Sequence, residues 1–71
     1  MALNNRLKEL RARHDLTQQA LAEKVDVSRQ SIISIEKGRY SPSVDLALRI
    51  ARVLRVPLEQ AFWLDDEEEG A

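Results

Sequence analysis

The stretch TQQALAEKVDVSRQSIISIEKG, from Thr17 to Gly38, predicts two short helices joined by a tight turn. Thr17 and Ser28 each stand directly before a helical pattern, where a hydroxyl can accept from the free backbone N–H groups of the first turn. Asp26 lies between the two patterns, and Asp tolerates a left-handed turn conformation better than most residues. The apolar residues of the first pattern recur at helical spacing and are Leu21, Ala22 and Val25.

The second of these helices, from Ser28 to Lys37, has an unusual outer face. Ile32 and Ile35 fall on one side with Ser28, and we expect this side to face the core. The other side carries hydrogen-bonding groups and an exposed isoleucine, with no acidic residue, whereas a merely solvated helix would mix Glu and Lys. The residues of this outer face are Arg29, Gln30, Ile33, Ser34 and Lys37.

Such a face suits the major groove of DNA. Arg can bond guanine, Gln can bond adenine, and an apolar side chain can meet a thymine methyl group. Two short helices with a three-residue turn form a helix-turn-helix, whose second helix places its N-terminal residues on the base edges. The residues that we expect to read bases are Arg29, Gln30, Ile33 and Ser34.

The chain resembles the XRE family, the helix-turn-helix domains of phage repressors and Cro proteins, from about Leu7 to Phe62. The resemblance implies an all-α fold, a compact five-helix lambda-repressor-like DNA-binding domain with helices 2 and 3 as the helix-turn-helix. Two positions depart from the family, which usually has Gly where Asp26 stands and often has Glu where Ala20 stands. The matching residues are Leu16-Thr17-Gln18, Leu21-Ala22, Val25, Val27, Ser28, Ile32, Ile35-Glu36-Lys37-Gly38, Pro42-Ser43, Leu46, Ile50-Ala51, Leu54 and Val56.

The resemblance also implies an ion pair, because Arg11 and Glu36 match an Arg and a Glu that commonly join the first helix to the recognition helix in XRE domains. Two independent surface charges are the alternative. By the same resemblance, the loop after Gly38 lies along the DNA backbone, the alternative being a solvated loop with its tyrosine packed on the domain. The residues expected at phosphates are Gln18, Ser28, Lys37, Arg39 and Tyr40.

The remaining helices are expected on either side of this motif. Asn4 or Asn5 can cap a first helix with Leu3, Leu7 and Leu10 facing inward. Ser43, or Ser41 ahead of Pro42, can cap a fourth helix to about Arg55, and a short fifth helix runs from Leu58 to Phe62. The last two helices carry more apolar surface than one small core needs. We therefore expect a homodimer interface, with purely internal packing as the alternative, at Leu48, Leu58, Phe62, Trp63 and Leu64.

The net charge of −1 hides a division along the chain. Five of the twelve acidic residues lie between Asp65 and Glu69, so residues 1–64 carry eleven basic and seven acidic residues, a net charge of +4. We expect a basic helix-turn-helix DNA-binding domain over 1–64 and an acidic, disordered tail over 65–71.

Composition argues against other classes of protein. The chain has no cysteine and one histidine, so we expect no disulfide, no metal site and no cofactor. There is no apolar run of roughly 18 residues and no apolar signal core, which favours a cytoplasmic, nucleoid-associated protein without a membrane partner. No nucleophile stands beside a base and no glycine-rich loop is present, so we do not expect an enzyme.

The sequence thus predicts a sequence-specific transcription regulator that binds a pseudo-palindromic operator in double-stranded DNA as a homodimer. Repression is the simplest mechanism, because it requires only occupancy of a promoter. The alternative is a protein-interaction module, such as an antitoxin or a phage accessory protein, that binds a partner through the fourth helix and Trp63.

Overall fold

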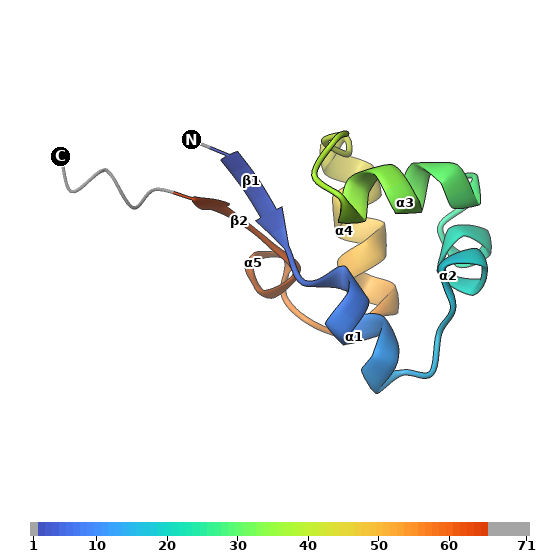
Figure 1. Ribbon diagram of the computed structural model, residues 1–71. Coiled ribbons are helices and arrows are strands. Elements are labelled where there is room, and N and C mark those ends of the chain that lie inside the picture. Colours follow the sequence, from blue (N-terminus) through green and yellow to red (C-terminus); the bar gives the residue numbers. More distant parts are fainter. Residues whose placement is uncertain (1, 66–71) are drawn as a thin grey trace, which may run out of the picture.

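The computed structural model describes residues 2–65, which form five helices and one two-stranded sheet (Figure 1). The predicted all-α, five-helix architecture is therefore confirmed apart from two short strands. The acidic tail falls outside the described residues except for Asp65. In chain order the elements are β1 (Ala2–Asn5), α1 (Leu7–Arg13), α2 (Gln18–Lys24), α3 (Arg29–Glu36), α4 (Val44–Val53), α5 (Leu58–Ala61) and β2 (Phe62–Asp65).

Three helices begin at the hydroxyl residues that the sequence indicated. In α2, α3 and α4 the capping oxygen accepts from the backbone N–H three residues on, at 2.9, 3.1 and 3.3 Å. The capping residues are Thr17, Ser28 and Ser43. Each cap satisfies one of the backbone donors that the first turn of a helix leaves without a partner. Helix α1 differs, because the side-chain oxygen of Asn5 accepts from the Leu7 N–H at 3.1 Å.

Helices α1 to α4 end in the same way, with one residue in the left-handed region. These residues have φ angles between 54° and 76°, and only one of them is glycine: Asp15, Asp26, Gly38 and Arg55. In each case the N–H of the left-handed residue and the N–H of the next residue donate to carbonyls of the last helical turns, which is the pattern of a Schellman motif. Asp26 thus adopts the left-handed turn predicted for it.

One apolar core holds the helices together. Helix α3 contributes Ile32 and Ile35 to it, the two residues predicted to face inward, with 0% and 2% of their surface exposed. The other buried core residues are Leu7, Leu10, Leu21, Ala22, Val25, Leu46, Ala47, Ile50, Ala51, Leu54, Ala61 and Phe62. Within residues 2–65, no helix has the length and apolar character needed to span a membrane.

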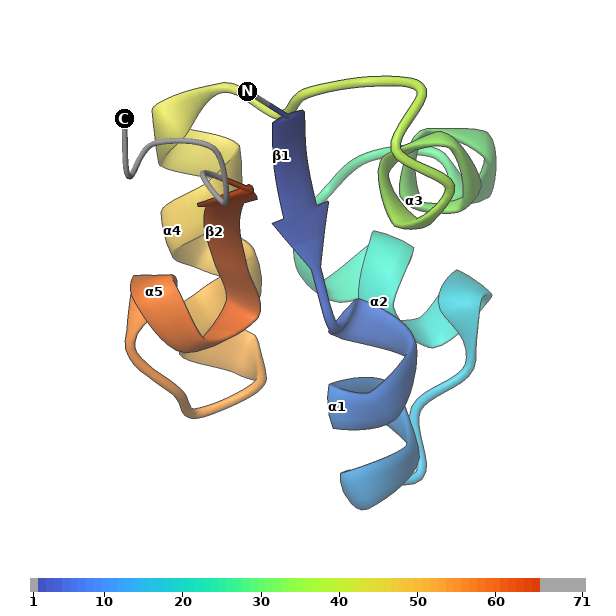
Figure 2. The ribbon, with the colours of Figure 1, turned by 60° about the vertical axis from the view of Figure 1, so that its left-hand side comes forward.

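The strands correct the sequence prediction at both ends of the chain. Leu3, expected on the first helix, lies in β1, and Phe62, expected to end the last helix, begins β2. The strands pair antiparallel from Asn5↔Phe62 to Ala2↔Asp65 and lie side by side (Figure 2). Phe62 was expected at the homodimer interface. It is only 6% exposed because it packs in the protein's own core, so its side chain is not available to a second copy.

Replacing Arg55 with glycine should stabilise the protein. Arg55 is exposed and has a φ of 59°, a conformation that costs a non-glycine residue about 1 kcal/mol. We expect Arg55→Gly to raise Tm by roughly 4–8 °C in thermal unfolding, the shift that about 1 kcal/mol produces in a domain of this size. The control is Arg52→Gly, which should lower stability by about 1 kcal/mol because Arg52 lies inside α4. A lower Tm for Arg55→Gly would contradict the account.

Candidate nucleic-acid interface

The ion pair expected from the sequence joins α1 to the end of α3. Arg11 Nε lies 2.6 Å from Glu36 Oε2, and Arg11 Nη2 donates to Glu36 Oε1 at 3.1 Å. Arg11 Nη1 also donates to the Leu16 carbonyl at 3.1 Å. The two charged side chains are only 13% and 9% exposed, so the contact is bidentate and mostly shielded from water.

Gln18 joins the same network. Its Nε2 donates to Glu36 Oε1 at 3.2 Å, so the side chain of this residue, expected at a phosphate, makes a contact inside the protein. Glu36 is the only acidic residue of α3, and three N–H groups from two other helices surround its carboxylate. The negative charge of α3 is therefore neutralised before any DNA approaches.

The outer face of α3 presents the side chains expected to read bases. Arg29 and Gln30 are exposed, whereas Ile33 and Ser34 are half-buried. Ile33 borders a groove toward α1 and α2, whereas Gln30 and Ser34 border a second hollow toward the loop that follows α3. The face is accordingly polar at its N-terminal end, with an apolar patch on one flank.

The groove on the α1 side is strongly basic. Four of its lining residues are cationic, and one of these, Arg11, is held by Glu36. We call this surface the basic groove, and its lining residues are Asn5, Arg6, Lys8, Arg11, Gln18, Ile33, Glu36 and Lys37. Arg6 and Lys8 were not among the predicted site residues, although both precede Arg11 on the first helix pattern. The guanidinium of Arg6 also stacks on the Trp63 ring, with Cζ 4.7 Å from the ring centroid.

The second hollow is lined by hydroxyl and amide groups. Its residues are Ser28, Gln30, Ser31, Ser34 and Tyr40. Tyr40 is 48% exposed, so its ring is partly packed and partly open to solvent. Ser28 Oγ accepts from the Ser31 N–H as the cap of α3 and also lies 3.1 Å from Ser31 Oγ, so both of these contacts are made within the first turn of the helix. Lys37 and Arg39 are exposed on either side of Gly38.

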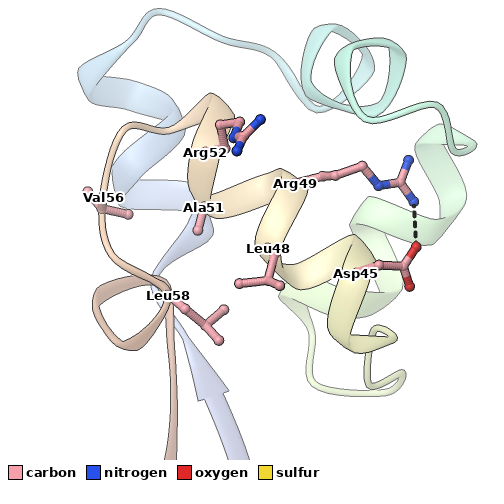
Figure 3. A pocket seen from close by; sticks show the side chains of 7 residues that line it. All are labelled: Asp45, Leu48, Arg49, Ala51, Arg52, Val56 and Leu58. Atoms are coloured by element: carbon pink, nitrogen blue, oxygen red, sulfur yellow. Dashed lines mark hydrogen bonds and ion pairs between the residues drawn. The ribbon is translucent and has the colours of Figure 1, made fainter.

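The outer surface of α4 is apolar at its centre and charged at its rim (Figure 3). Leu48 is 50% exposed and shares an open groove with Ala51, Val56 and Leu58. The charged residues of the rim are Asp45, Arg49 and Arg52. We call this surface the α4 groove.

Two of its rim charges are fixed within the molecule. Arg49 Nη1 donates to the Val25 carbonyl at 2.8 Å, and Nη2 lies 3.4 Å from Asp45 Oδ2. A hydrogen bond with the Ser43 side chain is the main cause that lowers the pKa of Asp45, and the nearby Arg49 charge lowers it further. Among residues 2–65, no group of three potential metal ligands comes together.

Comparison with known proteins identifies the class of this chain. A family model described as helix-turn-helix, HTH_3, matches residues 7–60. An uncharacterized HTH-type transcriptional regulator from Methanocaldococcus jannaschii is 52% identical over 66 residues, covering 93% of this chain and 100% of that protein. The immunity repressor protein of Bacillus phage phi105 is 38% identical over 56 residues, covering 79% of this chain and 39% of that protein. The crystal structure of the restriction-modification controller protein C.AhdI from Aeromonas hydrophila superposes with a TM-score of 0.71 at 28% identity, covering 76% of this chain and 82% of that one.

Removing the carboxylate of Glu36 should be costly. Glu36→Gln leaves the Arg11 guanidinium mostly buried without a counter-charge, and we expect a loss of about 3 kcal/mol in the free energy of unfolding, measured in urea. The control is Glu9→Gln, because Glu9 pairs with Arg13 through side chains that are 57% and 59% exposed. That variant should lose less than about 0.5 kcal/mol. Equal losses in the two variants would contradict the assigned role of the Arg11–Glu36 pair.

Proposed function

The chain belongs to the helix-turn-helix family HTH_3, and on that premise we propose that it reads a pseudo-palindromic operator with α3 as a homodimer. Its relatives are DNA-binding transcription regulators rather than enzymes, in agreement with the resemblance to XRE domains. The observation that carries the proposal is the outer face of α3, where Arg29 and Gln30 are exposed and the single acid, Glu36, is neutralised by Arg11.

In this proposal the bases are read by exposed residues at the start of α3 and by the half-buried Ile33 and Ser34. Arg29 can bond O6 and N7 of a guanine, and Gln30 can bond N6 and N7 of an adenine. Ile33 has the apolar surface to meet a thymine methyl group, and the Ser34 hydroxyl can donate to or accept from a base edge. Arg29 therefore favours a G·C pair, whereas Gln30 and Ile33 favour A·T pairs and the Ser34 hydroxyl can bond either.

Phosphate contacts would fix the domain on the groove. Lys37, Arg39 and the Tyr40 hydroxyl are exposed at the end of α3, and the basic groove adds Arg6 and Lys8. Gln18 has a second amide N–H besides the one given to Glu36, and Ser28 is exposed at the start of α3, so we retain both as phosphate contacts. These contacts set affinity and its salt dependence, since phosphates carry no sequence information.

A homodimer would place two α3 helices in successive major grooves, with half-site centres roughly 34 Å apart. We propose that the dimer interface includes Leu48, Leu58, Trp63 and Leu64, since Leu48 is 50% exposed and Leu64 is 55% exposed. Occupancy of a promoter would repress transcription in the cytoplasm, at the nucleoid. The similarity to a phage immunity repressor supports repression.

The α4 groove also favours a second candidate function, a module that binds a partner protein. An exposed Leu48 at the centre of that groove suits an apolar partner as well as a second copy. Solution mass separates the two functions. A homodimer covers the groove by itself, whereas a monomer leaves it open for another protein.

Selection from a random-sequence duplex library tests operator reading. The wild-type protein should enrich a palindrome, and Arg29→Ala should lose about 1–3 kcal/mol of binding free energy and relax the preference at one base pair. Arg39→Ala is the matched control: it should weaken all duplexes alike and lower the salt slope by about one. Equal losses on operator and random DNA for Arg29→Ala would contradict base reading by that residue.

A charge in the α4 groove should break the dimer. Leu48→Glu places a carboxylate at the centre of the proposed interface, and sedimentation equilibrium should show a shift from dimer to monomer at micromolar concentration. The control is Ala12→Glu, an exposed position on α1 outside that interface. A wild-type monomer would exclude the homodimer, and an unchanged dimer in Leu48→Glu would place the interface elsewhere.

A further inference from the structure

The recognition helix α3 ends differently from the other three helices that close with a left-handed residue. In α1, α2 and α4 the residue after the left-handed one is apolar and packs against the core, as Leu16, Val27 and Val56 do. Such an apolar contact commonly anchors a Schellman motif. In α3 the same position is Arg39, which is exposed. The end of α3 therefore lacks the apolar anchor that the other helices have.

A side-chain amide from the N-terminal strand contacts the end of α3 instead. Asn5 Nδ2 donates to the Ile35 carbonyl at 3.0 Å, across 30 residues of sequence. The same carbonyl accepts the Gly38 N–H at 3.0 Å, one of the two bonds that close α3. The oxygen of the Asn5 amide is also hydrogen-bonded: Oδ1 accepts from the Leu7 N–H at 3.1 Å. One amide thus connects the first turn of α1 to the last turn of α3.

The paired strands fix the position of Asn5. Asn5 is the last residue of β1 and lies opposite Phe62 in the sheet. The next residue, Arg6, donates its backbone N–H to the Ala61 carbonyl at 3.2 Å. Phe62 and Ala61 are both buried in the core. The pairing of β1 with β2 and the Arg6–Ala61 hydrogen bond therefore keep Asn5 next to α3.

We propose that Asn5 is a positioning residue for operator recognition, which holds the C-terminal turn of α3 and the loop carrying Arg39 in the geometry that DNA requires. The inference rests on the proposed function. Asn5 touches no base or phosphate in this account and acts through the Ile35 carbonyl and the closing bonds of α3. The paired strands, absent from the sequence prediction, thereby support the recognition helix through Asn5.

The chemistry of Asn5 lets its two roles be separated. Aspartate keeps an oxygen that can accept from the Leu7 N–H but has no N–H to give to the Ile35 carbonyl. Asn5→Asp should therefore keep the start of α1 and release the end of α3. Asn4→Asp is the matched control, since it adds the same charge one residue away, opposite Trp63 in the sheet. Asn5→Ser provides an uncharged variant whose hydroxyl can accept locally but is shorter than the amide.

The test combines amide hydrogen exchange with DNA binding. In Asn5→Asp and Asn5→Ser, exchange at the Gly38 and Arg39 amides should be about fivefold faster than in the wild type, with little change at core amides, because one neutral hydrogen bond has been lost. Both variants should bind the selected operator about fivefold more weakly than Asn4→Asp does.

The outcomes distinguish this inference from the proposed function. Unchanged exchange at Gly38 and Arg39 would overturn the inference, whatever the DNA result. A loss of operator affinity that is equal in Asn4→Asp and Asn5→Asp would overturn it too, since added charge alone would explain it. A wild-type protein that selects no operator would overturn the proposed function, and the exchange measurement would still decide whether Asn5 holds α3.

Discussion

The ion pair between Arg11 and Glu36 is the contact on which the recognition surface depends. It joins α1 to the last residue of α3 with a bidentate contact at 2.6 and 3.1 Å, mostly shielded from water. The pair also neutralises the only negative charge of α3 on the surface that faces phosphates in the proposed function. One contact therefore sets both the position of the helix and the sign of its field.

Short helices need firm ends, and this chain supplies them locally. Helices of 7 to 10 residues are marginal in water without tertiary contacts. Hydroxyl caps at Thr17, Ser28 and Ser43 satisfy donors at the starts, and left-handed residues close the ends. Only in α3 is the residue after the left-handed one an exposed cation, Arg39, and not an apolar residue packed on the core, so polar contacts from elsewhere in the chain hold the end of this helix.

What could be predicted from the sequence was local or carried by the family resemblance. The caps and the turn at Asp26 follow from neighbouring residues, and the Arg11–Glu36 pair followed from matching positions in XRE domains. The strands could not be predicted in this way, because each has four residues and its partner lies at the other end of the chain. Without that pairing, nothing in the sequence placed Asn5 on α3, and the burial of Phe62 in the core remained the less favoured of two alternatives.

Whether α3 meets DNA with its outer face is tested most directly by titrating the isotopically labelled protein with its selected duplex and following the amide chemical shifts. We expect the largest shifts in α3, in residues 38–41 and at the start of α2, with small shifts in α5 and at the centre of α4. Shifts confined to the α4 groove or to the paired strands would contradict it.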